Sequence, residues 1–253
     1  MQLEHVKAVV TGGVSGLGLA TVRHILANGG RAVMLDVNDD AGARAASETG
    51  TQYIHTDVTA EAAVADALDQ ASGFMGGLNA AVNCAGIIGA GRVLGREAPM
   101  ALSFFATTIT VNLIGSFNVA KSAADRMQHN EPGVDGERGI IINTASVAAY
   151  EGQIGQAAYS ASKAGLVGMT LPMARELARF GIRVVTIAPG IFWTPMVDGM
   201  PEHIQESLSA SIPFPSRLGQ PEEFAQLAGS VIESGYLNGT TIRLDGGVRL
   251  APK

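Results

Sequence analysis

Residues 6–18 read VKAVVTGGVSGLG, a short apolar run followed by a glycine-rich turn. The run has the length of one β-strand and is continuously apolar, as in strands that are covered on both faces. Glycines at 12, 16 and 18 allow a tight turn and let the next helix begin beside a pyrophosphate, which its N–H groups can bind. The stretch predicts a dinucleotide-binding unit, with an ordinary turn in a glycine-rich chain as the alternative. Its candidate cofactor contacts are Gly12, Ser15, Gly16, Leu17 and Gly18.

The same alternation of strand and helix patterns continues along the chain. Strands are expected at 6–11, 31–36, 52–56, 78–83, 139–144, 182–188 and 240–244, and helices near 16–28, 39–48, 60–73, 100–128, 157–180 and 221–233. This order predicts an α/β fold, a Rossmann-type doubly wound parallel sheet of about seven strands with helices on both faces. No Pro- or Ser-rich linker divides the 253 residues, so a single domain spanning 1–253 is expected. Residues 190–219 form a long excursion, which in a compact domain usually serves a site.

Composition and charge disfavour several classes of function. A net charge of −6 without any basic run argues against nucleic acid as a partner. The single cysteine, Cys84, excludes an intrachain disulfide and fits a reducing compartment. We expect a cytoplasmic protein without a membrane partner, because the sequence has no run of 18 apolar residues and no signal-peptide pattern near its start. The five histidines share no spacing, and no metal site is expected.

Asp36 stands at the end of the second expected strand, 20 residues after Gly16. A carboxylate there can accept hydrogen bonds from the ribose hydroxyls of an adenine dinucleotide; the alternative is a helix N-cap. It would repel a 2′-phosphate, and residues 12–18 and 37–40 hold no Arg or Lys, so NAD is favoured over NADP. Asp57 and Val58, just past the third strand, are candidate adenine contacts, although the pair alone indicates only a turn.

Tyr159 and Lys163 are four residues apart in an expected helix, and therefore on one helix face. Ser146 ends the fifth strand, at the edge where doubly wound sheets bind ligands; alone it would be interpreted as a helix cap or a turn. Asn112 lies inside the helix expected at 100–128, where asparagine is unfavourable. It predicts a local distortion or a water-mediated proton relay to Lys163, with a satisfied buried amide as the alternative.

Together these motifs resemble the classical short-chain dehydrogenase/reductase family over essentially the whole chain. The resemblance rests on the glycine spacing, NCAG at 83–86, Asn112, Ser146 and Tyr159-x-x-x-Lys163, in the family's order. It implies Asn112, Ser146, Tyr159 and Lys163 as catalytic residues. It also implies Asn83, Cys84, Ala85, Gly86, Tyr159, Lys163, Pro189, Phe192 and Thr194 as cofactor contacts. Cys84 replaces an Asn that many members carry; only its backbone is expected near the cofactor ribose.

The tetrad suits the removal of a hydroxyl proton during hydride transfer. A phenol with a pKa near ~10 is a poor base at neutral pH. We expect the Lys163 ammonium, helped by the positive nicotinamide, to favour the phenolate of Tyr159. The Ser146 hydroxyl would polarise the substrate oxygen. The family resemblance implies that Lys163 also holds the nicotinamide ribose.

A closer resemblance, strong through 107–247 and weaker at 88–106, is to the type II 3-hydroxyacyl-CoA dehydrogenases, the group that includes 17β-hydroxysteroid dehydrogenase type 10. It implies NAD-dependent interconversion of a 3-hydroxyacyl-CoA and its 3-oxoacyl-CoA by a homotetramer. A steroid-like or 3-oxoacyl-carrier-protein substrate is the alternative within this class. A non-catalytic dinucleotide sensor or scaffold is the alternative from another class, disfavoured because Ser146, Tyr159 and Lys163 are all present.

Substrate contacts are expected from Ser146, Tyr159, Gln153 and Gln156, the two glutamines having ordinary loop polarity as the alternative. The excursion at 190–219 is expected to act as a lid with an apolar underside. That underside would consist of Phe192, Trp193, Met196, Met200, Leu208, Ile212 and Phe214. Arg92 or Arg96 would meet the phosphates of CoA.

Overall fold

A computed structural model describes residues 1–194 and 202–252. Within them, one sheet of seven parallel strands has the order β3-β2-β1-β4-β5-β6-β7. The strands are β1 (Lys7–Thr11), β2 (Arg31–Asp36), β3 (Tyr53–His55), β4 (Ala80–Asn83), β5 (Gly139–Thr144), β6 (Ile182–Pro189) and β7 (Thr241–Leu244). The predicted doubly wound parallel sheet is confirmed.

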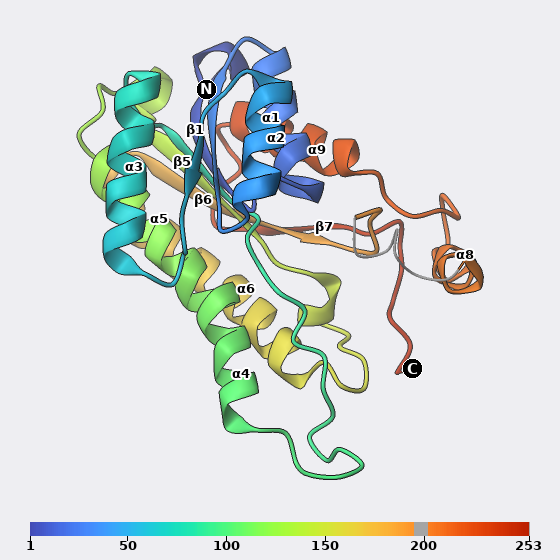
Figure 1. The fold of residues 1–253 in the computed structure, drawn as a ribbon. Helices are drawn as coiled ribbons and strands as arrows, with labels where there is room; N and C mark the ends of the chain where they lie inside the picture. The colour runs from blue at the N-terminus through green and yellow to red at the C-terminus, as the bar shows by residue number, and fades with distance from the viewer. Residues whose placement is uncertain (195–201, 253) are drawn as a thin grey trace.

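Helices cover both faces of the sheet (Figure 1). The long ones are α1 (Gly16–Ala27), α2 (Asp39–Thr49), α3 (Glu61–Met75), α4 (Leu102–Ile109), α5 (Gly115–Met127), α6 (Ala157–Leu177), α8 (Glu202–Ala210) and α9 (Pro221–Glu233). Shorter turns are η1 (Leu3–His5), η2 (Thr110–Ile114), η3 (Val134–Gly136), η4 (Val147–Ala149) and η5 (Ala178–Phe180). Residues of α1, α2 and α9 pack on one face, and residues of α3, α5 and α6 pack on the other.

The continuously apolar strands are explained by this double cover. On β1, Val10 packs with α1 and α9, whereas its neighbour Val9 packs with α3 and α5. Both side chains are fully buried, and so are Ile140, Ile141 and Ile142 on β5. Successive side chains of a strand point to opposite faces, so a strand covered twice must be apolar at every position.

The strand order reverses between β1 and β4, because β2 and β3 lie on one side of β1 and the later strands lie on the other. In open parallel sheets, ligands bind outside the carboxyl ends of the strands at this point of reversal. The glycine turn after β1, the NCAG segment after β4 and Ser146 after β5 all start from this edge. The topology therefore gathers residues that are far apart in the sequence.

The helix expected at 100–128 is present but interrupted. A π-helical stretch, η2, separates α4 from α5, and Asn112 lies at its centre. The local distortion that an interior asparagine predicted is confirmed. The whole stretch Leu102–Met127 is long and apolar enough to cross a membrane, by length and composition only, and 33% of its most apolar window is buried. A core helix of a soluble protein passes the same test.

Candidate active site

The turn after β1 has no room for side chains at two of its glycines. Gly12 has a φ of +62°, and a Cβ there would lie 2.9 Å from the backbone nitrogen of Ala85. A Cβ on Gly18 would collide with the carbonyl oxygen of Gly12. Gly16 also has a positive φ, +48°. The turn is thus a backbone cradle, as close approach to a dinucleotide requires.

The start of α1 faces this cradle with free N–H groups. Ser15 is the N-cap residue, and its side chain makes no capping hydrogen bond. The first N–H groups of a helix lack partners within the helix and favour an anion. Leu17, two residues after Ser15, packs partly against the core, and its backbone carbonyl accepts a hydrogen bond from the Thr21 hydroxyl. These features fit the pyrophosphate of a nicotinamide dinucleotide.

Asp36 lies half-buried at the end of β2. Its Oδ1 accepts a hydrogen bond from the backbone nitrogen of Asn38 at 3.1 Å. The N-cap of α2 is Asn38, whose Oδ1 accepts from Ala41 at 3.0 Å. The helix N-cap alternative for Asp36 is therefore wrong, and its carboxylate stays at the sheet edge with capacity for further hydrogen bonds.

The two candidate adenine contacts differ in availability. Asp57 is exposed, and its Oδ1 accepts from the backbone nitrogen and the hydroxyl of Thr59 at 2.9 and 2.8 Å. Val58 is only 7% exposed and packs in the core. A Cβ on Gly115 would touch the Val58 side chain, which shows how closely α5 approaches it. Val58 was predicted as an apolar contact from its position in a turn, but its side chain mainly packs against α5.

The NCAG segment is fixed by backbone hydrogen bonds to Thr11. Cys84 donates to the Thr11 carbonyl and Ala85 to the Thr11 hydroxyl, both at 3.1 Å. The Asn83 side chain points away into the core, where it donates to Ser116 and Asn143. Any contact of Asn83 with a cofactor is thus left to its backbone.

Cys84 and Gly86 lie close to Lys163. Burial raises the pKa of the Cys84 thiol to about 11, so it is protonated at neutral pH. A Cβ on Gly86 would lie 3.6 Å from the Nζ of Lys163. The segment therefore brings the backbone of Gly86 to the candidate catalytic lysine, as the family resemblance implies for the ribose site.

The three central catalytic candidates come together at the carboxyl edge of β5. Tyr159 and Lys163 lie on α6, and the Nζ of Lys163 is 5.7 Å from the centre of the Tyr159 ring. The side chain of Ser146 lies close enough to the Tyr159 hydroxyl to lower the pKa of the phenol. Ser146 also accepts from the backbone nitrogen of Ala148 at 3.1 Å and so caps η4. The cap interpretation and the catalytic one therefore both apply to Ser146.

Burial is the largest influence on the pKa values of Tyr159 and Lys163. Burial raises the pKa of Tyr159, and the side chain of Ser146 lowers it. Burial lowers the pKa of Lys163 to about 8. Its Nζ donates to the backbone carbonyl of Thr144 at 2.7 Å. Among the residues of the chain alone, burial and Ser146 are the causes of the shift in the pKa of Tyr159, and the lowering expected from Lys163 together with the positive nicotinamide stays a prediction.

Asn112 links the segment after β4 to helix α6 by hydrogen bonds. Its Oδ1 accepts from the backbone nitrogen of Ile87 at 2.8 Å, and its Nδ2 donates to the Ile87 carbonyl at 2.9 Å. The same Nδ2 donates to Ser162, whose hydroxyl donates to the carbonyl of Tyr159. The satisfied buried amide is thus present alongside the distortion. Sequence reasoning missed Ser162 and Thr144. Ser162 takes part through a hydroxyl inside α6, and Thr144 takes part through its backbone carbonyl, and no motif indicates either group.

The segment after β6 is partly core. Pro189 ends β6, and Thr194 is half-buried. Phe192 is 7% exposed and bridges to Gly219, so its side chain packs in the core rather than along a lid. Of the residues predicted to form the apolar underside, Phe192 and Ile212 are buried and Phe214 is 83% exposed. Met196 and Met200 lie outside the described residues.

Gln153 and Gln156 hydrogen-bond with each other instead of standing free. The Nε2 of Gln156 donates to the Oε1 of Gln153 at 3.4 Å, and the Oε1 of Gln156 accepts from the Gln153 backbone at 3.0 Å. The Gln153 amide also donates to the carbonyl of Ala251 at 3.2 Å. Both side chains lie on the approach to Tyr159, but in this structure they order the loop.

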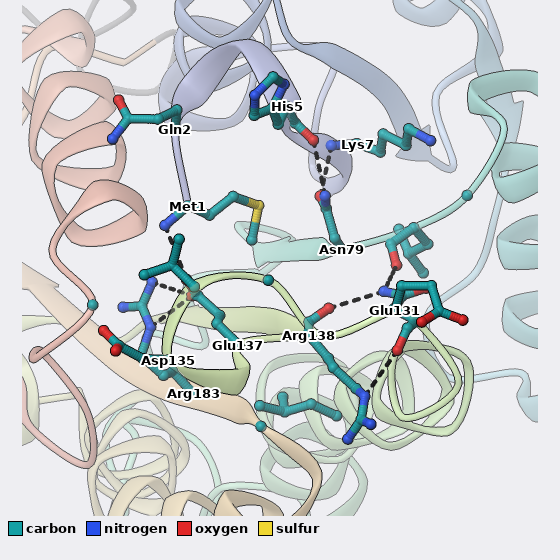
Figure 2. A pocket seen from close by; sticks show the side chains of 18 of the residues that line it. Met1, Gln2, His5, Lys7, Asn79, Glu131, Asp135, Glu137, Arg138 and Arg183 are labelled. Carbon is teal, nitrogen blue, oxygen red and sulfur yellow. Dashed lines mark hydrogen bonds and ion pairs between the residues drawn. The ribbon is translucent and has the colours of Figure 1, made fainter.

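A separate pocket of about 780 Å³ lies at the opposite edge of the sheet (Figure 2). Lys7 begins β1 there, and Ile182 begins β6. Glu137 and Arg183 pair across the pocket at 2.6 Å. No candidate catalytic residue is among those that line it, so the chemistry belongs to the carboxyl edge. Among the described residues, no three His, Cys, Asp or Glu side chains gather to hold a metal ion.

Comparison with known proteins identifies the family. The model of the short chain dehydrogenase family matches residues 6–205. The chain belongs to the short-chain dehydrogenase family. It is therefore an oxidoreductase enzyme whose cofactor is a nicotinamide dinucleotide.

Similar members of this family match over almost their whole length. The chain is 51% identical to a Homo sapiens protein named 3-hydroxyacyl-CoA dehydrogenase type-2, over 97% of this chain and 95% of that one. It is 46% identical to a Drosophila melanogaster protein of the same name, over 99% and 100%. A crystal structure of 3-hydroxyacyl-CoA dehydrogenase type-2 from Mycobacterium avium superposes with a TM-score of 0.95 at 43% identity, covering 99% and 98% of the two chains.

Proposed function

We propose that this enzyme interconverts a 3-hydroxyacyl-CoA and the corresponding 3-oxoacyl-CoA with NAD. The similarity to 3-hydroxyacyl-CoA dehydrogenases at about half of all positions, over nearly the full chain, is the observation that carries this proposal. The grouping of Ser146, Tyr159 and Lys163 supports alcohol oxidation as the reaction. When bound, the nicotinamide accepts the hydride from the alcohol carbon.

Each of the three residues has a role that follows from its position. Tyr159 takes the hydroxyl proton of the substrate, because its phenol is the acid–base group at the centre of the cluster. Ser146, whose side chain lies beside that phenol, stabilises the charge that develops on the substrate oxygen. Lys163, beside Gly86, holds the ribose of the cofactor and places a positive charge near the phenol when protonated.

NAD is the proposed form of the cofactor because of Asp36. Replacing Asp36 by alanine and Val37 by arginine should raise the ratio of kcat/KM for NADP to that for NAD about 10- to 100-fold. Hydrogen bonds to a charged group contribute about 1.5–3 kcal/mol, which corresponds to that range. Initial rates with each cofactor, read as absorbance at 340 nm, measure the ratio.

Asp40→Ala is the matched control, since it removes an exposed acid from the first turn of α2. It should leave the preference within about threefold of the original if Asp36 acts by direct contact. An unchanged preference in the double variant would show that Asp36 does not bind the ribose.

The proposed acyl-CoA substrate enters beside the loop that precedes Tyr159. Gly91 donates to the carbonyl of Gly155 at 2.7 Å, so the segment at 88–100 packs against that loop. A shallow hollow of about 480 Å³ between them is lined by Arg92, Val93, Ile154 and Gly155. An exposed arginine beside apolar side chains suits a phosphate-bearing thioester, and we assign Arg92 to the CoA phosphates.

We expect (S)-3-hydroxybutyryl-CoA, or a short branched analogue, to be oxidised with a higher kcat/KM than any hydroxysteroid. The hollow is shallow and open, which suits a small acyl group attached to a bulky carrier. A panel of 3-hydroxyacyl-CoAs, the corresponding acyl-carrier-protein thioesters and hydroxysteroids, each with NAD, measures this. Preference for a steroid over every acyl-CoA would overturn the substrate assignment.

We also propose that the enzyme is a homotetramer. Exposed apolar side chains gather on α4, η2, α5 and α6, at Leu102, Phe104, Ile114, Phe117 and Leu171. The family pairs these helices across a two-fold axis and packs the last strand across another; two different isologous contacts close a tetramer. Light scattering at micromolar concentration should give four times the chain mass of 26.0 kDa.

Charge on the helix surface tests the same assembly. The variant Ile114→Glu with Phe117→Glu should reduce the tetramer to a smaller species, because burying carboxylates is costly. Phe74→Glu on α3, where the side chain is equally exposed, is the matched control and should remain tetrameric. A monomeric wild-type chain would reject the proposal.

A further inference from the structure

Four charged side chains form a cluster at the end of β7, where Arg243 of the strand meets Glu151 from the loop before α6. Arg243 binds both carboxylate oxygens of Glu151 at 2.9 Å, and its Nε donates to Asp245 at 2.7 Å. Arg249 joins the same two acids, at 3.5 Å from Glu151 and 3.1 Å from Asp245. The Arg243 guanidinium also lies 5.1 Å from the ring centre of Tyr150. A bidentate pair within a network holds its geometry better than an isolated surface pair.

Arg243 is the centre of this cluster. Its side chain is 23% exposed and that of Asp245 is 10% exposed, whereas Arg249 is 58% exposed. Arg243 also donates to the carbonyl of Val248 at 3.2 Å, so it binds both ends of the turn 245–248. Removing Arg243 would leave Glu151, Asp245 and the carbonyl of Val248 with the more exposed Arg249 as their remaining arginine partner.

The turn 245–248 supports the base of the excursion. Val248 is buried with Ile212 and Leu218, and Ile191 packs against the same group. The backbone of Phe214 donates to Gly246 at 3.2 Å, and Gly190 donates to Leu244 at 2.9 Å. Both arms of the excursion therefore rest on the turn that Arg243 holds.

The segment that follows the turn reaches the loop before Tyr159. Figure 1 shows it leaving β7 near α8. Ile154 donates to the carbonyl of Pro252 at 3.0 Å, and Gln153 donates to that of Ala251 at 3.2 Å. Glu151, which Arg243 binds directly, precedes both residues on the same loop. One side chain thus connects the loop that borders the proposed substrate entrance to the turn 245–248 at the base of the excursion.

We infer that Arg243 is a positioning residue for the substrate site. It acts through Glu151 on the loop 150–156 and through Asp245 on the base of the excursion, and it fixes the spacing between them. It touches neither the glycine cradle nor the group of Ser146, Tyr159 and Lys163, so we expect it to affect substrate binding more than cofactor binding. The substrate half of this inference rests on the proposed function.

Arg243→Met should raise the KM for (S)-3-hydroxybutyryl-CoA about tenfold or more, with kcat within about threefold of the original. The Kd for NADH, followed by its fluorescence, should change less than twofold. Arg243→Lys keeps the charge but loses the bidentate contact, and it should restore part of the KM. Arg126→Met is the matched control, because Arg126 also pairs with an acid, Asp69, through two of its nitrogens, between α5 and α3. It should change neither constant.

Trp193, the single tryptophan, provides a readout that needs no substrate. Its backbone donates to Gly219 at 2.7 Å at the base of the excursion. Arg243→Met should increase quenching of Trp193 fluorescence by acrylamide about twofold relative to wild type and to Arg126→Met. If that variant does not fold, Glu151→Gln, of nearly equal shape, should show the same direction of change in KM and quenching.

The outcomes separate this inference from the proposed function. If the wild type oxidises no acyl-CoA, the proposed substrate is wrong, and the quenching comparison still tests the connection. Arg243 is not a positioning residue if acrylamide quenches Trp193 fluorescence in the folded variants no more than in the control and the variants keep the wild-type KM. An equal loss of NADH binding in Arg243→Met would also overturn it, because the role would then be general stability.

Discussion

Tyr159→Phe should lower kcat by about 10²- to 10⁴-fold, the range that a positioned acid–base group contributes. Phenylalanine keeps the ring and its packing on α6 but lacks the hydroxyl that lies beside Ser146. The substrate then has no group to take its proton at the centre of the site. NADH binding should stay within about twofold, because the glycine cradle and Gly86 are unchanged. Single-turnover rates with 3-hydroxybutyryl-CoA and an NADH titration measure the two effects.

Tyr236→Phe is the control for loss of a phenol, since Tyr236 is fully exposed. It should keep full activity. Turnover at the wild-type rate in Tyr159→Phe would remove the proposed base. A parallel loss of NADH binding would instead indicate that the phenol shapes the cofactor site.

The sheet could be predicted because its strands are continuously apolar and bounded by turns. β2 and β5 begin and end where the sequence indicates, since burial on both faces constrains every position. The site residues carried by motifs, such as Gly12 and Gly18, also could be placed. Their constraint is steric and local, because a side chain at either position would meet backbone.

Contacts that depend on packing across the fold could not be predicted in the same way. Val58 and Phe192 lie in segments that read as site-lining loops, yet each fills a space left by a glycine, Gly115 and Gly219. Gln153 bonds to the carbonyl of Ala251, 98 residues away, and the sequence gives no signal for a backbone partner. Lys163 shows the same dependence on packing, because its Nζ donates to the carbonyl of Thr144, a backbone partner that no motif indicates.

Lys163→Met should lose most activity and yet stabilise the fold at neutral pH. Lys163 is 6% exposed, and burial lowers its pKa from 10.5 to about 8. Below pH 8 it is charged in both the folded and the unfolded chain, so the folded state bears the whole penalty of burying an ammonium. Methionine has a similar length and no charge. It removes that penalty and also the hydrogen bond to Thr144, which costs about 0.5–1.5 kcal/mol.

The sign of the pH dependence follows from proton binding. Between pH 8 and 10.5 the unfolded chain keeps the Lys163 proton and the folded chain has released it. The unfolded state then binds more protons, so the wild-type free energy of unfolding rises with pH across this window. One pKa unit corresponds to about 1.4 kcal/mol, so the advantage of Lys163→Met should shrink by up to about 3 kcal/mol from pH 8 to 10.5.

Urea unfolding of both chains at fixed protein concentration, from pH 7 to 10.5, measures this difference. Lys121→Met is the control, because Lys121 is a 43% exposed lysine paired with Glu61. The difference in free energy of unfolding between Lys121→Met and wild type should change by less than about 1 kcal/mol across the same pH window. If the difference in free energy of unfolding between Lys163→Met and wild type stays constant or widens with pH, burial of the charged Lys163 does not destabilise the folded chain. The lysine would then be available for catalysis without destabilising the site, because nothing would oppose its charge.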